Sequence, residues 1–117
     1  MDDQGTTLSR TVYVNGAFAP EEEARVSIFD RGFLMGDGVY EVVPVLQGRL
    51  IENPGHLARL ERSLRELKMR SPVPMDELTR LMKALVEKNG LEEGVVYLQV
   101  TRGAAERDFV FPADAEP

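Results

Sequence analysis

The sequence predicts an α+β fold in which two helices pack on one face of an antiparallel sheet. Three observations support this prediction: hairpin signals in the first half of the chain, two consecutive segments whose leucines recur at helical spacing, and a β-prone run over residues 95–103. Strands that come before and after a block of helices, instead of alternating with them, are typical of α+β domains.

The first part of the chain predicts short strands joined by tight turns. Residues 11–19 place Asn15-Gly16 between two β-prone runs, which is the strongest short-range hairpin signal. Residues 25–29 alternate polar and apolar side chains, so they predict another short strand. The stretch DRGFLMGDG, residues 30–38, contains three glycines and predicts a tight corner before the next strand.

A longer strand is predicted over residues 39–47, VYEVVPVLQ, with RLIE after Gly48 returning as the second arm of a hairpin. Pro44 cannot donate a ladder hydrogen bond, so the strand should lie at a sheet edge there, or bulge. The two-residue period of a strand puts Tyr40 on the opposite face from Glu41.

Two helices are predicted in the middle of the chain. Asn53-Pro54 marks the start of the first, with Asn53 as N-cap, and this helix should end near residue 69. Its leucines share one face and are Leu57, Leu60, Leu64 and Leu67. The second helix is predicted from about Met75 to Lys88, where Asn89-Gly90 is a typical stop.

Composition excludes several classes of protein. The chain has 117 residues, 43% of them hydrophobic, which suits one ordered domain. The net charge of −6 argues against nucleic acid or an anionic membrane as partner. With no cysteine and one histidine, the chain cannot form a disulfide, a thiolate site or a His-rich metal site, and no metal is expected. No apolar run approaches about 18 residues, so no membrane span is expected. The first ten residues have no apolar core and do not resemble a signal peptide, so a cytoplasmic protein is expected.

Several side chains could carry chemistry, and the residues alone leave two interpretations of each. Tyr40 is either a half-buried packing residue or a phenol that donates to a carboxylate. Arg59 is either solvated or, with His56 one turn earlier, part of an anion site near a helix start. Arg102 and Arg107 are either rim charges that balance neighbouring acids, or Arg107 is a guanidinium fork for a carboxylate or phosphate.

Four motifs in order resemble a known family. They are YVNGAF at 13–18, DRGFLMGDGVYEVVPV at 30–45, HLARL at 56–60 and VTRGAAERDFVFP at 100–112. Together they resemble the N-terminal small domain of the fold-type IV, or class IV, pyridoxal-phosphate aminotransferases, in the D-amino-acid transaminase branch. The resemblance extends over almost the whole chain.

The resemblance implies a role for three residues. Tyr40 would direct its hydroxyl toward the substrate α-carboxylate, and Arg59 would bind the phosphate of pyridoxal 5'-phosphate. Arg107 would grip the carboxylate from a loop offered across a homodimer interface. The implied reaction is transamination, in which a D-amino acid gives its amino group to a 2-oxo acid.

The resemblance also implies that this chain lacks the catalytic lysine. Its lysines, Lys68, Lys83 and Lys88, are all predicted to lie on the two helices and match no catalytic motif. The expected organisation is a loose N-terminus over 1–11, a small α+β domain over 12–112, and the start of a linker over 113–117. The Schiff-base lysine is expected in a C-terminal domain after this linker, and the chain alone is expected to be inactive.

One position departs from the family pattern and keeps other functions open. Phe109 stands where D-amino-acid transaminases typically carry a histidine, and phenylalanine offers the carboxylate no hydrogen bond. The alternatives within the family are a branched-chain L-amino-acid transaminase and an aminodeoxychorismate lyase. An alternative of another class is a cofactor-free binding or assembly module that acts alone.

Overall fold

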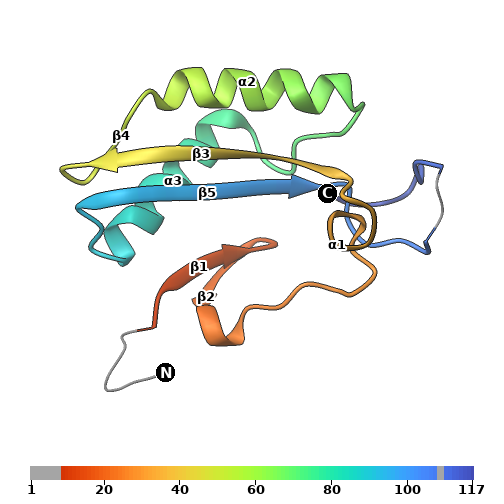
Figure 1. Ribbon diagram of the computed structural model, residues 1–117, viewed down its shortest axis with the longest axis horizontal. Helices are drawn as coiled ribbons and strands as arrows, with labels where there is room; N and C mark the ends of the chain where they lie inside the picture. The colour runs from red at the N-terminus through yellow and green to blue at the C-terminus, as the bar shows by residue number, and fades with distance from the viewer. Residues whose placement is uncertain (1–8, 108–109) are drawn as a thin grey trace.

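The computed structural model describes residues 9–107 and 110–117, which form an α+β arrangement (Figure 1). In chain order the elements are β1 (Thr11–Val14), β2 (Ala17–Pro20), a 3-10 turn (Glu21–Glu23), α1 (Arg31–Met35), β3 (Gly38–Leu46), β4 (Arg49–Leu50), α2 (Asn53–Glu66), α3 (Met75–Lys88) and β5 (Glu93–Thr101). Strands β4, β3 and β5 form an antiparallel sheet in that order, and β1 pairs with β2. Both predicted hairpins and both predicted helices are therefore confirmed.

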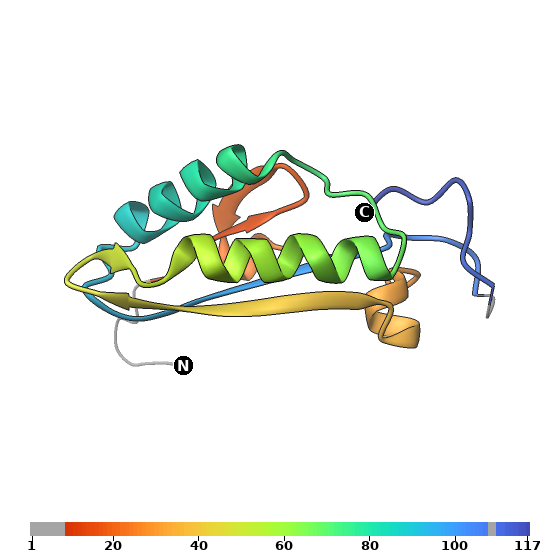
Figure 2. The same cartoon turned by 90° about the horizontal axis from the view of Figure 1, so that it is seen from above.

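The two long helices lie on the same side of the three-stranded sheet, as predicted (Figure 2). The core forms where their apolar stripes meet the inner face of β3 and β5. Its buried members are Val43, Val45, Leu57, Leu60, Leu64, Met69, Met82, Val86, Val96 and Val100. The outer face of the sheet keeps large side chains exposed, and Tyr40 is one of them.

The predicted strand over residues 25–29 is wrong. The segment forms a turn, in which the amide of Phe29 donates to Ser27 Oγ and the amide of Asp30 donates to the Ser27 carbonyl. Its apolar side chains face outward, since Val26 is 58% exposed and Ile28 is 68% exposed. An alternating pattern forms a strand only where a neighbouring strand pairs with its backbone and a core buries its apolar face. This segment has neither.

The predicted corner at residues 30–38 is confirmed and contains the one-turn helix α1. Asp30 caps α1 by accepting a hydrogen bond from the amide of Gly32, and Gly36 ends it with a φ of 64°. A Cβ at Gly32 would overlap the Thr101 side chain, so the corner can pack against the end of β5 only with glycine there.

The ends of α2 differ from the prediction. Glu52, with a φ of 58°, precedes the first turn, and Asn53 lies within the helix. Asn53 is buried and donates to Thr79 Oγ1 of α3 across 3.3 Å, so tertiary packing uses the side chain that local sequence assigned to capping. The helix ends at Glu66 because Lys68 adopts a φ of 55° and the amide of Met69 turns back to the Leu64 carbonyl. Lys68 thus lies outside α2, whereas the sequence predicted it to lie on that helix.

Pro44 lies at a sheet edge, as predicted. Strand β4 pairs only with Val45 and Leu46, so its pairing with β3 stops just before Pro44. The Pro44 carbonyl accepts from the amide of Ile51 on that side. In a strand, the N and C=O of one residue point to the same side, so the Pro44 nitrogen also faces away from β5. The missing N–H of proline therefore removes no hydrogen bond between β3 and β5.

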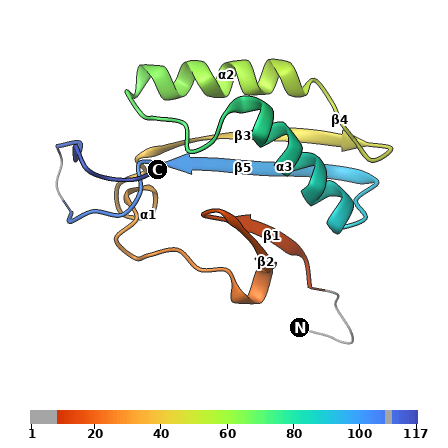
Figure 3. The same ribbon diagram turned by 180° about the vertical axis from the view of Figure 1, so that it is seen from behind.

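The end of α3 lies near the N-terminal hairpin (Figure 3), and Asn89 joins the two. Its Oδ1 accepts from the amide of Thr11 at 2.9 Å, while Nδ2 donates to the Thr11 carbonyl at 2.9 Å and to the Leu85 carbonyl at 2.8 Å. The side-chain amide thus pairs with the edge of β1 as a strand residue would. The same residue caps the helix and docks the hairpin.

Replacing Asn89 with alanine should lower the free energy of unfolding by about 1–2 kcal/mol, because three hydrogen bonds are lost at once from a partly solvated position. Urea denaturation measures this difference. Arg80→Ala on the same helix removes only exposed ion pairs and should change stability by less than about 0.5 kcal/mol. Equal, small effects of the two changes would show that Asn89 does not dock the hairpin.

Candidate functional site

Tyr40 lies on the outer face of β3, and its side chain is accessible. It is 63% exposed, and its ring stacks on Tyr97 of β5 with centroids 5.6 Å apart and planes at 20°. The half-buried packing interpretation is therefore wrong. The Tyr97 ring supports the Tyr40 ring from one side and leaves the phenol accessible.

Glu41, the next residue, points to the helix side of the sheet and is 4% exposed. Its Oε2 accepts from Arg59 Nε at 2.8 Å, and its Oε1 accepts from Arg59 Nη2 at 2.9 Å. Oε1 also lies 2.7 Å from His56 Nδ1. The Arg59 hydrogen bond, reinforced by His56 and opposed by burial, lowers the pKa of Glu41 from 4.5 to about 2. The carboxylate is therefore ionised at neutral pH.

Arg59 is not a solvated arginine without a partner, although its side chain is 58% exposed. The guanidinium has five N–H donors, and Glu41 uses one on Nε and one on Nη2. Within the described part of the chain, the other three donors remain for an acceptor outside the domain. The hydrogen bond to Glu41 and its charge raise the pKa of Arg59, and the nearby Tyr40 adds to this. β3 and α2 thus bring Glu41, His56 and Arg59 together on the helix side of the sheet, while Tyr40 lies on the opposite face of β3.

Sequence reasoning gave Glu41 no role, although one signal could have found it. A glutamate on the buried face of a strand requires a partner, because an unpaired buried carboxylate is strongly unfavourable. The only histidine in the sequence and an arginine three residues later, both on the next helix, are such partners. What the sequence could not supply was the rotation of α2 over β3 that brings them to Glu41.

A second ionic group lies where the corner over residues 30–38 meets the start of β3. Asp37 Oδ2 accepts from Arg31 Nε at 2.7 Å and from Arg102 Nε at 2.8 Å. All three residues are buried, so Arg102 is not a charge at the protein rim as one interpretation held. Burial tends to raise the pKa of Asp37, but the hydrogen bonds from Arg102 and Arg31 outweigh it and hold this pKa below its usual value. The group ties α1, β3 and β5 together.

Arg107 lies exposed in the loop that follows β5. The last pair of the β3–β5 ladder is Gly38 with Thr101, and Tyr40 pairs with Gln99 two positions before it. The Arg107 loop therefore leaves the sheet at the end where Tyr40 lies (Figure 1). Phe109 is outside the described residues.

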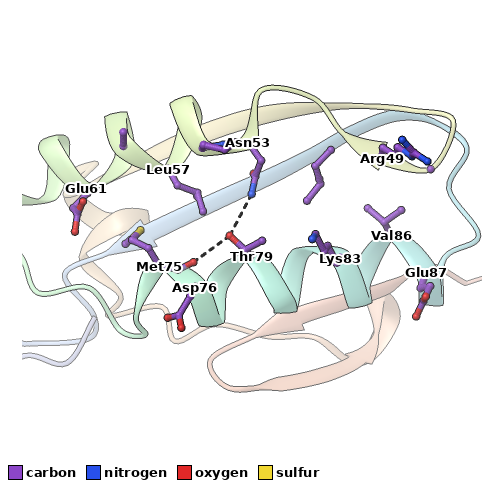
Figure 4. Close-up of a pocket in the computed structure, with 14 residues that line it drawn as sticks. Arg49, Asn53, Leu57, Glu61, Met75, Asp76, Thr79, Lys83, Val86 and Glu87 are labelled. Atoms are coloured by element: carbon purple, nitrogen blue, oxygen red, sulfur yellow. Dashed lines mark hydrogen bonds between the residues drawn. The ribbon is translucent and has the colours of Figure 1, made fainter.

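A hollow in the described part of the molecule lies apart from these side chains. It is a groove of about 840 Å³ between α2, α3 and β4 (Figure 4). Leu57, Met75 and Val86 line it, and the hydrogen bond from Asn53 to Thr79 bridges the two helices across it. None of Tyr40, Arg59 and Arg107 lines this groove.

Within residues 9–107 and 110–117, no group of three or more histidine and carboxylate side chains is arranged to hold a metal ion. No helix in this part of the chain has the length and apolar character needed to cross a membrane.

Comparison with known proteins identifies the family. Residues 38–117 match the model of the amino-transferase class IV family. Over 107 residues the chain is 41% identical to a D-alanine aminotransferase of Staphylococcus aureus, covering 91% of this chain and 38% of that protein. A D-alanine aminotransferase of Listeria monocytogenes is 41% identical over 104 residues, which is 88% of this chain and 36% of that protein. The chain belongs to the class IV aminotransferases and spans less than two-fifths of the length of these relatives.

Solved structures agree with this assignment. A branched-chain amino acid aminotransferase from T.th., complexed with N-(5'-phosphopyridoxyl)-L-glutamate, matches with a TM-score of 0.83 and 25% identity, covering 96% of this chain and 39% of that one. A 4-amino-4-deoxychorismate lyase from Pseudomonas aeruginosa matches with a TM-score of 0.64 and 37% identity, covering 79% of this chain and 33% of that one. The predicted fold and the family resemblance are both confirmed.

Proposed function

We propose that this chain is the N-terminal domain of a pyridoxal-phosphate-dependent transaminase that moves an amino group from a D-amino acid to a 2-oxo acid. The observation that carries the proposal is the arrangement at the start of β3, where buried Glu41 orients Arg59 and the adjacent residue Tyr40 is exposed on the other face of the strand. Similarity to D-alanine aminotransferases over 91% of the chain supports the D-amino-acid substrate class.

The residues present fit the phosphate of the cofactor. Arg59 offers three N–H donors beyond those used by Glu41, and a planar guanidinium suits phosphate oxygens. Glu41 fixes the side chain in one direction, so less conformational freedom is lost when the phosphate binds. When bound, pyridoxal phosphate supplies the electron sink for the substrate α-carbon. This domain's part is to hold the phosphate at Arg59.

The substrate carboxylate is proposed to lie between Tyr40 and Arg107. The Tyr40 hydroxyl donates one hydrogen bond, and the Arg107 guanidinium supplies a charge-assisted pair. In the proposed homodimer, Arg107 reaches the site of the partner subunit. Phe109 adds no hydrogen bond, so carboxylate binding depends on these two side chains.

The catalytic lysine is proposed to lie outside this chain. Lys83 and Lys88 are on α3, and Lys68 follows α2. The proposed organisation is therefore a small domain over 12–112 and a linker start at 113–117, leading to a C-terminal domain that provides the lysine. The enzyme is proposed to be cytoplasmic. The isolated 117 residues should not transaminate, and the intact mass of the purified protein tests whether a second domain follows.

The second candidate is a branched-chain L-amino-acid transaminase or an aminodeoxychorismate lyase that uses the same domain. Phe109 favours it, because the histidine typical of D-amino-acid transaminases is absent. The structural similarity to a branched-chain aminotransferase and to a 4-amino-4-deoxychorismate lyase also fits. Separate rates with D- and L-enantiomers decide between them, since preference for L-leucine over D-alanine would reject the D-specific proposal.

Replacing Arg107 with alanine in the full-length enzyme should lower kcat/KM for D-alanine and D-glutamate by about 10- to 150-fold, because a hydrogen bond to a charged group contributes roughly 1.5–3 kcal/mol. Steady-state kinetics measure this change. Arg80→Ala, which removes an exposed arginine of α3, is the matched control and should leave kcat/KM within about twofold. A change below about threefold in the Arg107 variant would reject its role in carboxylate binding.

A further inference from the structure

Both ends of the loop that carries Arg107 contact buried arginines, and Arg102 is involved at each end. At the first end, the amide of Arg102 donates to the Asp37 carbonyl at 3.1 Å, and the amide of Arg31 donates to the Gly103 carbonyl at 2.8 Å. At the second end, the Phe111 ring lies over Arg102, with Cζ 3.7 Å from the ring centroid. The contact between Phe111 and Arg102 thus joins the residues on either side of Arg107.

Arg102 is a fixed support for this contact. It is 6% exposed, and its guanidinium donates to Asp37 Oδ2 and, at 2.9 Å, to the Leu67 carbonyl at the end of α2. These bonds hold the guanidinium plane in one orientation. Phe111 is 51% exposed, so one ring face lies on the guanidinium and the ring is not simply a core side chain.

The segment after Phe111 also packs against the residues that follow β5. A Cβ added to Gly103 would overlap the Glu116 carbonyl oxygen, so the tail crosses directly over Gly103. Arg70 also pairs with Glu116, with Nη2 and Oε2 3.2 Å apart. The Phe111 contact is therefore the first of several attachments that return the chain to the end of β5.

We propose that Phe111 is a positioning residue for Arg107. By stacking on Arg102 it fixes the chain four residues after Arg107, so that Arg107 is held ready for a carboxylate instead of being ordered at each binding event. This inference rests on the proposed function, because it takes Arg107 as the carboxylate-binding side chain. The physical contribution is a cation–π contact made on a guanidinium removed from water.

Substitutions at Phe111 can separate the π face from apolar bulk. Phe111→Leu keeps an apolar side chain but removes the aromatic face, whereas Phe111→Tyr keeps that face. Phe18→Leu is the matched control, because Lys88 Nζ lies 5.0 Å from the Phe18 ring centroid in the distant hairpin. It removes a cation–π contact of the same kind without touching Arg102.

The first measurement is the rate of trypsin cleavage after Arg107 in the full-length protein, followed by mass spectrometry and normalised to cleavage after Arg25. Phe111→Leu should raise this rate about fivefold, within the roughly 2- to 30-fold range that a cation–π contact implies for the population of the open loop. Phe111→Tyr and Phe18→Leu should stay within about twofold of the wild type. An unchanged rate in Phe111→Leu would overturn the proposal.

The second measurement is steady-state kinetics on the same variants, with Arg107→Ala beside them. Phe111→Leu should raise KM for the amino acid about fivefold and change kcat by less than about twofold, because a loop that must be ordered on binding weakens binding itself. Faster cleavage with an unchanged KM would overturn the positioning role while leaving Arg107 in place. If Arg107→Ala also leaves KM unchanged, the proposed function of Arg107 fails instead, and the cleavage rates still report whether Phe111 anchors the loop.

Discussion

Replacing Asp37 with asparagine is expected to lower the free energy of unfolding by about 3–5 kcal/mol. Asparagine keeps the shape of the side chain but removes its charge. The guanidinium groups of Arg31 and Arg102 then face a neutral amide at a site where all three residues are buried. A buried cation that loses its carboxylate is costly, because the penalty for removing it from water is no longer offset.

Chemical denaturation of the full-length protein measures this loss, with Asp76→Asn as the matched control. Asp76 lies on α3 with its side chain 76% exposed, 3.7 Å from Arg80, and removing that exposed charge should cost less than about 0.5 kcal/mol. Equal stability of the two variants would show that the three-residue ionic group does not hold the corner together.

The second large effect is a pH-dependent loss of stability at Glu41. The folded-state pKa of this carboxyl is lowered from 4.5 to about 2, so the unfolded state binds its proton first as the pH falls. The stabilisation is therefore fully present above about pH 5 and is lost as the pH falls toward 2. A shift of this size corresponds to roughly 3 kcal/mol.

Glu41→Gln should accordingly be less stable than the wild type by roughly 3 kcal/mol at pH 7, and the two should converge near pH 2. Denaturation at a series of pH values measures the gap between them, which isolates Glu41 from the other carboxyls. Glu61→Gln on the exposed side of α2 is the matched control. A gap that does not change between pH 7 and pH 2 would contradict the ionic role of Glu41.

The sequence was sufficient for the fold where local signals and burial agree. Asn15-Gly16 in the first hairpin, the leucine stripe of α2 and the Asn89-Gly90 stop of α3 are each set by a few neighbouring residues. The errors fall where a distant contact decides. Asn53 was expected to cap its own helix, but it bonds to Thr79 of the next one.

The candidate site was less accessible to sequence reasoning. Tyr40, Arg59 and Arg107 were selected by resemblance to a family, while their chemistry alone left ordinary interpretations open. The pairing of Glu41 with His56 and Arg59 spans 15 and 18 residues and depends on how α2 packs over β3. The burial of Arg102 depends likewise on contacts with Asp37 and with the end of α2. The residues next to each side chain in the sequence do not determine such contacts.

Helix α2 connects Arg59 to the Arg107 loop, which is proposed to serve the site of the partner subunit. It carries Arg59 near its middle, and the carbonyl groups of Leu67 and Lys68, just past its end, accept hydrogen bonds from Arg102. A displacement of α2 along its axis would therefore move Arg59, the proposed phosphate-binding residue, and the support of the Arg107 loop in the same direction. In thermodynamic terms, such a movement links the two sites: if phosphate binding at Arg59 tightens the grip of Arg107 on a carboxylate, the carboxylate must tighten phosphate binding by the same factor.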